Sequence, residues 1–373
     1  MRPVSLAARL PDAAAKAGLP TRLLLHDLTA ADLPGNLAAR QHCIIVTGRY
    51  SARESGALAD ITAVLDGAGI GHTVFDGVTE NPKMSECRQG AALVKQTAAS
   101  LIIGIGGGSP LDAAKAIAIL AANDLKDEQL FALQFRSPRL PLMLVGTTAG
   151  TGSEVTAVAV ITQDNGVKRS IVCPDCLPDT SLLVPRYTYT CAPSVAMSTA
   201  LDALMHATEG YFSPGCPQVA LQTAERCIPT IWRGICTMAA GQEPDKAELY
   251  YASVWAGITL KLCGTAHPHP LSYVLSELYH VPHGRACAVF LPSLLRRASE
   301  YASDRLARFT ALTGQSPDQV AALAARAADV RLTLQAAEID ALLPRFTSLK
   351  NYANTPGGFS GEEAVEVYRE LFL

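Results

Sequence analysis

The sequence predicts an α/β domain built on a parallel sheet, followed by an all-α domain. Two observations support this prediction. Short apolar runs alternate with helical patterns in the first half of the 373-residue chain, and long helical patterns replace them in the second half. No low-complexity linker separates the halves, so we expect residues 1–186 and 187–373 to form the two domains.

Five apolar runs in the first half have the length of strands and are bounded by glycine or polar residues. Between the first three runs, segments 54–69 and 85–99 repeat apolar residues at intervals of three and four, which is typical of helices. Strands that alternate with helices indicate a parallel sheet covered by helices. The predicted strands are 43–48, 72–77, 100–106, 140–148 and 157–162.

The second half has long helical periodicity and little strand signal. Its helices must bury their apolar faces against one another, which defines an all-α domain. The predicted helices are 219–241, 245–264, 316–335 and 361–372.

Composition limits the class of protein. Hydrophobic residues make up 49% of the chain and charged residues 17%, which excludes a disordered chain. The net charge of -3, without a basic block, argues against nucleic acid or a membrane surface as a partner. No apolar stretch approaches the roughly 18 residues of a membrane span. The N-terminus lacks the pattern of a secretory signal, so we expect a cytoplasmic protein with a small-molecule partner.

The ten cysteines lack the spacing of a disulfide framework and indicate reduced thiols. Cys173 and Cys176 form the one CxxC motif. Without a second cysteine pair to complete a four-thiolate site, a zinc or redox role is not favoured there.

A glycine-rich segment follows the third predicted strand and opens a helix. Gly106, Gly107 and Gly108 allow backbone N–H groups to approach an anion at the positive end of that helix. Ser109 is predicted as its N-cap, with Asp112 completing a capping-box-like start. The segment therefore predicts a phosphate site, with a tight turn that binds no ligand as the alternative.

A second glycine-rich segment, residues 146–156, also follows a strand. Thr147, Thr148 and Thr151 offer hydroxyl groups that suit phosphate and ribose hydrogen bonds. Two such turns at strand ends of one sheet favour a dinucleotide over a single phosphate. An ordinary loop is the alternative if this segment is taken alone.

Histidines gather in the second half. Asp202 and His206 are spaced i, i+4 on a predicted helix, so both side chains lie on one face, as paired metal ligands do. His267, His269, His280 and His283 follow further along the chain. One carboxylate with two or three imidazoles predicts a divalent-metal site, although any one of these histidines alone would more often be structural.

Four ordered motifs, GGGSPLDAAK, TTAGTGSEVT, DALMHATEGY and VPHG, resemble the iron-containing (group III) alcohol dehydrogenase family over nearly the whole chain. The resemblance implies an N-terminal dinucleotide-binding domain with a Rossmann-like sheet and a C-terminal metal-binding helical domain. It also implies nicotinamide-dependent interconversion of an alcohol and an aldehyde or ketone.

The resemblance implies the ligand set, which is Asp202, His206, His269 and His283. The family spacing selects His269 rather than His267, which we expect to support the catalytic site from a structural or neighbouring position. His280 is expected to face solvent or to lie beside the site. Fe(II) is the family's metal, although carboxylate and imidazole ligands also accept Zn(II) and other ions.

The chain departs from the family pattern at two functional positions. Tyr273 stands where many members carry a proton-relaying histidine, so Tyr273 is predicted either to orient or protonate the substrate oxygen or to line the pocket. Gly48 stands where NAD-preferring members place an aspartate, and Arg49, Ser51 and Arg53 follow it. Guanidinium and hydroxyl groups suit a 2'-phosphate, which predicts NADP(H) over NAD(H) unless both arginines are merely solvated.

Two smaller features accompany these departures. Lys168 matches a family lysine near the cofactor ribose, and a surface position is the alternative. Gly146 replaces a common proline, which is expected to loosen the turn.

The predicted reaction is hydride transfer between NADP(H) and a small aldehyde or primary alcohol, with a metal ion as Lewis acid. Ser272 and Tyr273 resemble a branch that includes reductases of phosphonoacetaldehyde-like compounds, and Arg285 could meet such an anionic tail. The rivals are a lyase related to dehydroquinate synthase and a catalytically silent metal-binding protein. A homodimer or larger homo-oligomer is expected from the relatives.

Overall fold

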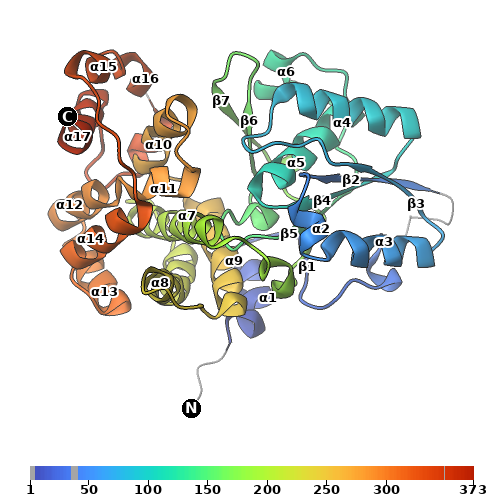
Figure 1. Ribbon diagram of the computed structural model, residues 1–373, viewed down its shortest axis with the longest axis horizontal. Helices are drawn as coiled ribbons and strands as arrows, with labels where there is room; N and C mark the ends of the chain where they lie inside the picture. Colours follow the sequence, from blue (N-terminus) through green and yellow to red (C-terminus); the bar gives the residue numbers. More distant parts are fainter. Residues whose placement is uncertain (1–4, 35–40, 348) are drawn as a thin grey trace. The chain divides into compact units, whose positions relative to one another are not determined.

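A computed structural model describes residues 5–34, 41–347 and 349–373 of the chain (Figure 1). These residues divide into two compact units. The first is an α/β unit, Gly18–Ala192. The second is a helical unit that joins Pro193–Leu373 with the described part of Met1–Ala17.

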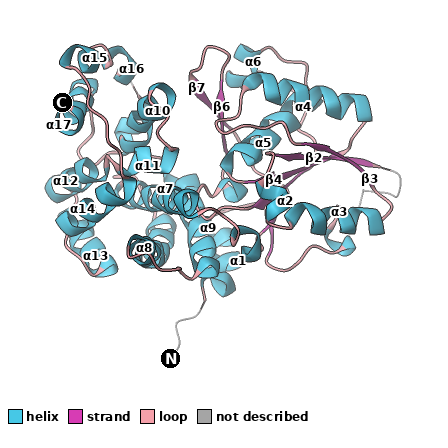
Figure 2. Cartoon of the chain, in the orientation of Figure 1, coloured by secondary structure: helices cyan, strands magenta, loops and turns pink. Residues whose placement is uncertain are grey.

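The α/β unit contains a six-stranded, fully parallel sheet in the order β1-β8-β5-β4-β2-β3 (Figure 2). The predicted Rossmann-like α/β fold is thereby confirmed. The strands are β1 Arg22–Leu24, β2 His42–Thr47, β3 Gly71–Phe75, β4 Leu101–Gly106, β5 Leu142–Gly146 and β8 Thr180–Leu182. The helices are α2 Ser51–Glu54, α3 Ala57–Gly67, α4 Met84–Thr97, α5 Gly108–Ala122 and α6 Asp127–Phe131.

Helices cover both faces of this sheet because side chains alternate along each strand. Ile44 and Val46 of β2 pack in the core that contains α4 and α5. Cys43 and Ile45 of the same strand pack in the opposite core, with residues of α2 and α3. The strands are therefore apolar on both faces, which explains their continuous apolar runs.

The fifth predicted strand does not join the parallel sheet. β6 Val158–Thr162 pairs with β7 Lys168–Val172 in an antiparallel hairpin. Gly166 in the turn has φ +83°, a conformation that favours glycine. Ala159 and Ile161 belong to the core that contains α5, so burial against that helix takes the place of sheet pairing.

The helical unit is organised around one long helix, α7 Pro193–Phe212, which is buried continuously from Ala200 to its end. α8, α9 and α11 all pack against it. No described helix is long and apolar enough to cross a membrane. The other helices are α1 Leu6–Lys16, α8 Gln218–Ala239, α9 Lys246–Cys263, α10 Pro268–Leu278, α11 His283–Ala288, α12 Leu291–Tyr301, α13 Ser303–Thr313, α14 Pro317–Ala328, α15 Ala336–Asp340, α16 Leu343–Phe346 and α17 Gly361–Phe372.

The N-terminal helix belongs to the helical unit, whereas the sequence placed residues 1–186 together. α1 contacts α8 and α9, and its buried residues are Leu6, Leu10, Ala13 and Ala14. The indole nitrogen of Trp255 in α9 donates to the Leu6 carbonyl at 3.2 Å. Apolar burial thus assigns this helix to partners more than 200 residues away in the sequence.

Candidate metal centre and nucleotide-binding turns

Asp202 and His206 lie one turn apart on α7, as their spacing predicts. Both side chains are buried, and Asp202 Oδ1 lies 3.6 Å from His206 Nε2. α11 lies very close to this helix at Gly284. A Cβ on this residue would lie 1.8 Å from the Ser198 carbonyl oxygen. Only glycine fits that contact, and it places the first turn of α11 against the part of α7 that carries Asp202.

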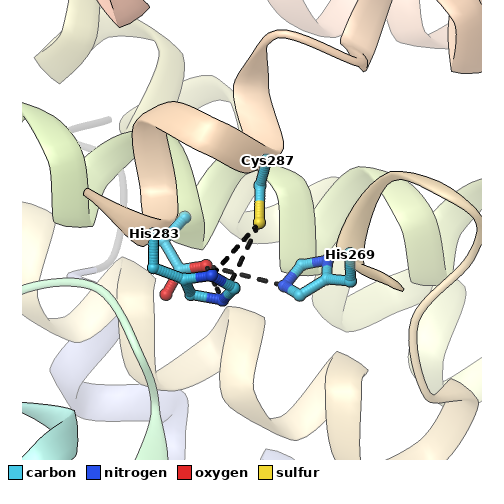
Figure 3. A group of neighbouring side chains, drawn as sticks. His269, His283 and Cys287 are labelled. Atoms are coloured by element: carbon cyan, nitrogen blue, oxygen red, sulfur yellow. Dashed lines mark hydrogen bonds and ion pairs between the residues drawn. The ribbon is translucent and has the colours of Figure 1, made fainter. Parts of the chain in front are cut away.

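Two more imidazoles reach the same carboxylate. His269 stands in the first turn of α10 and His283 begins α11. Their Nε2 atoms lie 3.6 and 3.7 Å from Asp202 Oδ1. Figure 3 shows His269 and His283 directed toward the same carboxylate. Three ring nitrogens therefore surround one oxygen atom.

The donor atoms at the centre of this cluster lack ordinary partners. Asp202 Oδ1 and His269 Nε2 are buried and have no hydrogen-bond partner among the described residues. Burying a polar atom without a partner costs about 1–3 kcal/mol. Burial raises the pKa of Asp202, but the facing imidazoles of His206, His269 and His283 oppose it and hold the pKa well below its usual range. An anionic oxygen among imidazoles fits a divalent cation.

Glu209 supports this cluster, and our sequence interpretation did not identify it. Its Oε1 lies 2.5 Å from His269 Nδ1, and its Oε2 accepts a hydrogen bond from the Ala266 N–H at 2.6 Å. With Nδ1 donating to the carboxylate, Nε2 keeps its lone pair for a metal ion. Glu209 follows Asp202 by two helical turns on α7, and this shared face is the signal that could have found it.

His267, predicted to support the catalytic site, is a packing residue. Its ring is fully buried, stacks on Phe359 at a centroid distance of 4.1 Å and contacts the hydroxyls of Thr355 and Ser293 at 3.3 and 3.1 Å. Burial lowers the pKa of His267 to about 3, assisted by the positive charges of two arginines. Both ring nitrogens therefore contact hydroxyl groups in the interior, which corresponds to the structural one of the two positions expected for His267.

Tyr273 lies one turn after His269 on α10, half-buried, with its ring 5.9 Å from the His283 ring. The phenol therefore stands next to the imidazole cluster. His280 is exposed and has a positive φ of 55°. Arg285 donates a hydrogen bond to the Ala328 carbonyl at 3.0 Å, so it contacts the last turn of α14.

The two glycine-rich turns lie side by side at the carboxyl ends of the neighbouring strands β4 and β5. Gly106 has φ +155°, and a Cβ there would lie 2.6 Å from the Pro110 ring. A Cβ on Gly107 would lie 3.2 Å from Thr148, and one on Gly108 would lie 2.7 Å from Thr151. The missing side chains let the side chains of Thr148 and Thr151 pack against the glycine backbone at the start of α5, where N–H groups suit an anion.

The predicted cap of this helix differs in the structure. α5 begins at Gly108 with Gly107 as N-cap, whereas Ser109 accepts a hydrogen bond from the Asn81 N–H at 3.2 Å. Asp112, predicted to contact the cofactor, accepts from Ser153 Oγ at 2.7 Å and from the Val160 N–H at 2.9 Å. Its carboxylate thus fixes the second turn and β6 to α5 instead of forming a capping box.

Thr147 at the end of β5 has a buried hydroxyl with no hydrogen-bond partner among the described residues. Its N–H donates to the Gly106 carbonyl at 2.9 Å, which ties the two turns together. Thr148 and Thr151 are half-buried beside the glycines. These three threonines therefore lie where the sequence placed them, next to the glycine turn.

The residues predicted to select the cofactor divide into two places. Gly48 follows β2, and a Cβ there would lie 3.8 Å from Pro110, so it adjoins the glycine turn. Arg49 is exposed and Ser51 begins α2, whereas the Arg53 guanidinium pairs with Asp76 at 3.2 Å. Lys168 begins β7, in the hairpin that is separate from the parallel sheet.

Comparisons with known proteins agree with this arrangement. The family model for "Iron-containing alcohol dehydrogenase" matches residues 20–185, and that for "Fe-containing alcohol dehydrogenase family, C-terminal" matches residues 196–340. Lactaldehyde reductase of Escherichia coli (strain K12) is 30% identical over 71% of this chain and 70% of its own length. 1,3-Propanediol dehydrogenase of Klebsiella pneumoniae is 33% identical over 70% and 68%.

A solved structure extends the likeness to the fold. The iron-containing alcohol dehydrogenase from Thermotoga maritima superposes with a TM-score of 0.86 at 29% identity. The match covers 95% of this chain and 98% of the other. Both units of the chain therefore have counterparts in one known architecture.

Proposed function

Because the chain belongs to the iron-containing alcohol dehydrogenase family, and is thus an oxidoreductase acting on alcohols or aldehydes, we propose that it transfers a hydride between NADP(H) and a small aldehyde or primary alcohol. The observation that supports this most directly is the convergence of three imidazoles on a single buried oxygen of Asp202. Such a cluster is costly in the absence of a cation, and it suits a reaction in which negative charge develops on oxygen.

The residues that would hold the metal ion are Asp202, His206, His269 and His283. Their fit rests on the partnerless buried Asp202 Oδ1 and His269 Nε2. Fe(II) is proposed from the family's name, and the same donors also accept Zn(II). When bound, the ion supplies Lewis-acid stabilisation of the charge on the substrate oxygen.

The chain's own side chains prepare this site. Glu209 fixes the ring of His269 through Nδ1, so that Nε2 is the ring atom that would bind the metal ion. Tyr273, beside His283, is proposed to hold the substrate oxygen or to donate a proton to it. Tyr273→Phe tests this role, because a proton donor predicts lower kcat and a changed pH profile. Full turnover with the wild-type profile would leave the phenol as pocket lining.

The glycine turn is proposed to hold the cofactor phosphates. N–H groups at the start of α5 and the hydroxyls of Thr147, Thr148 and Thr151 provide donors for phosphate oxygens. Lys168 is retained only as a proposed ribose contact, which Lys168→Ala tests through the KM for the cofactor.

NADP(H) preference is proposed from Gly48, Arg49 and Ser51, because glycine at position 48 offers no carboxylate to repel a 2'-phosphate. Arg53 contributes less, because Asp76 already pairs with it. The ratio of kcat/KM for NADPH and NADH decides the preference. We expect Arg49→Ala to lower that ratio about tenfold, the worth of one charge-assisted hydrogen bond. A higher kcat/KM with NADH in the wild type would refute the proposal.

A neutral short-chain aldehyde or alcohol is the proposed substrate class. The anionic-tail alternative, with a phosphonoacetaldehyde-like compound, loses support because Arg285 is bonded to α14. A screen of neutral and anionic aldehydes for NADPH oxidation, with metal content measured in parallel, tests both. A lyase would not consume NADPH persistently. A silent metal-binding protein would retain metal without turning over any aldehyde.

Two expectations from the sequence stay predictions. Light scattering would measure whether the chain forms a homodimer or larger homo-oligomer. Localisation of the tagged protein would test the cytoplasmic assignment.

A further inference from the structure

The thiol of Cys287 lies in the metal cluster, where no expectation placed it. Cys287 follows His283 by one turn on α11, so both side chains lie on the same face of the helix. Its Sγ lies 3.7 Å from His283 Nε2 and 3.8 Å from Nδ1. The residue is fully buried, and Figure 3 shows its sulfur directed at the imidazole.

One donor atom from each of Asp202, His269, His283 and Cys287 lies within 4.8 Å of all the others. Ligand atoms that bind one ion at about 2.0–2.3 Å can be no more than about 4.6 Å apart. The observed separations are thus close to those of a shared site. Among the described residues, no other group of three or more histidine, cysteine or acidic side chains meets this distance criterion.

The surroundings of this sulfur are polar, unlike those of an ordinary buried thiol. Cys287 donates to Ser272 Oγ at 3.2 Å, and Ser272 donates to the His269 carbonyl at 2.6 Å. Cys227 on α8 offers a comparison, since its thiol is equally buried but bonds to the Ala224 carbonyl of its own helix at 3.5 Å. Cys287 is thus a buried thiol held against the proposed metal ligands by two neighbouring helices.

We propose that Cys287 binds the metal ion through its sulfur, so that the centre offers a thiolate in addition to one carboxylate and the imidazoles. This inference rests on the proposed metal site. On binding, the S–H bond breaks, a metal–sulfur bond forms and the proton passes to the buffer, with no change in oxidation state. A soft sulfur donor favours Zn(II) and Co(II) relative to a site of nitrogen and oxygen donors alone.

Cobalt(II) titrated into the metal-free full-length protein tests the ligand directly. Wild type is expected to show visible bands from Co(II) in the site and a near-ultraviolet sulfur-to-cobalt charge-transfer band. Cys287→Ser should keep the visible bands and lose the near-ultraviolet band. Cys227→Ser, the matched control, should keep both.

The remaining outcomes distinguish a failure of the Cys287 proposal from a failure of the proposed metal site. Visible bands without a near-ultraviolet band in wild type would overturn the role of Cys287 and leave the proposed metal site standing. A near-ultraviolet band that survives Cys287→Ser would overturn it too. Failure of wild type to bind cobalt would refute the metal site and this inference together.

X-ray absorption of the zinc-loaded wild type provides a reading that needs no variant to fold. A sulfur neighbour at about 2.3 Å, beside nitrogen and oxygen neighbours at about 2.0–2.1 Å, is expected. Cys173→Ser controls for binding at the CxxC thiols, whose Sγ atoms lie 3.7 Å apart, and should keep the sulfur neighbour. A nitrogen and oxygen shell alone, or a sulfur signal lost only in Cys173→Ser, would contradict the proposal.

Discussion

The metal cluster and the glycine turn are built in opposite ways. The cluster consists of side chains from α7, α10 and α11 that surround the Asp202 carboxylate. The turn at the start of α5 works through the absence of side chains at Gly106, Gly107 and Gly108. The first site should therefore fail when a donor atom changes, and the second when a single methyl group is added. Each change should also spare the other site.

The largest expected effect comes from Asp202→Asn. The amide keeps the size of the side chain but removes the charge that all three imidazoles face. We expect loss of bound metal and a fall in kcat/KM of at least about 10³-fold, since a metal ion contributes several kcal/mol. Metal per chain and steady-state kinetics measure this, and NADPH binding should persist as the control. Full metal content would contradict the assignment.

A smaller loss is expected from Glu209→Gln. The carboxylate serves two donors, His269 Nδ1 and the Ala266 N–H, whereas an amide has only one acceptor oxygen. Metal affinity should fall about 10–100-fold, as measured by competition with a chelator. Glu225→Gln on α8, whose carboxylate contacts Arg308 at 3.3 Å, is the control and should bind metal normally. If both variants bound metal with equal affinity, Glu209 would have a packing role only.

Gly108→Ala tests the other site. Its new Cβ would lie 2.7 Å from Thr151, and relieving such overpacking costs about 1–3 kcal/mol. The KM for NADPH should rise about tenfold while metal content stays unchanged. Gly67→Ala at the end of α3 is the control, because nothing lies within 4 Å of its added Cβ. An unchanged KM in Gly108→Ala would show that the turn does not hold the cofactor.

The smallest expected effect is on the pH dependence of stability, to which His267 contributes as a buried packing residue of the helical unit. Its folded pKa of about 3 lies below the unfolded value of about 6.5, so only the unfolded chain takes up a proton between these values. The stability that this group contributes is complete above about pH 6.5 and falls by up to about 1.4 kcal/mol per pH unit below it.

His267→Gln should be less stable at pH 7 and should lose less stability on acidification. Urea unfolding at pH 7, 6 and 5 measures the difference. His280→Gln, at an exposed position, should follow the wild-type curve. If the free energies of unfolding of wild type and His267→Gln changed in parallel with pH, the imidazole of His267 would not be held neutral.

Sequence reasoning succeeded where function depends on local spacing. The i, i+4 pair of Asp202 and His206 faces one way on α7, and the glycine turn does open a helix after a strand. It could not assign Glu209, because its partner His269 is 60 residues away. It also left the position of His267 open, since the start of α10 at Pro268 separates His267, in the core, from His269, which faces Asp202.

Two of the described strands that periodicity missed are short and pair over a long distance in the sequence. β1 and β8 have three residues each, and they pair residues 22–24 with 180–182. Three residues cannot display a period of two clearly, so tertiary pairing defines them. The predicted Ser109 cap failed for a related reason, because Asn81 and Ser153 compete for Ser109 and Asp112.

The position of α1 gives the chain an unusual order of assembly. This helix is synthesised well before its partners α8 and α9, which are complete only after Cys263. At about 5–20 residues per second, α1 waits on the order of 10–50 s with its apolar face uncovered. The α/β unit can be synthesised entirely within that interval. The helical unit can therefore be completed only after the whole α/β unit, which lies between its two segments in the sequence, has been synthesised.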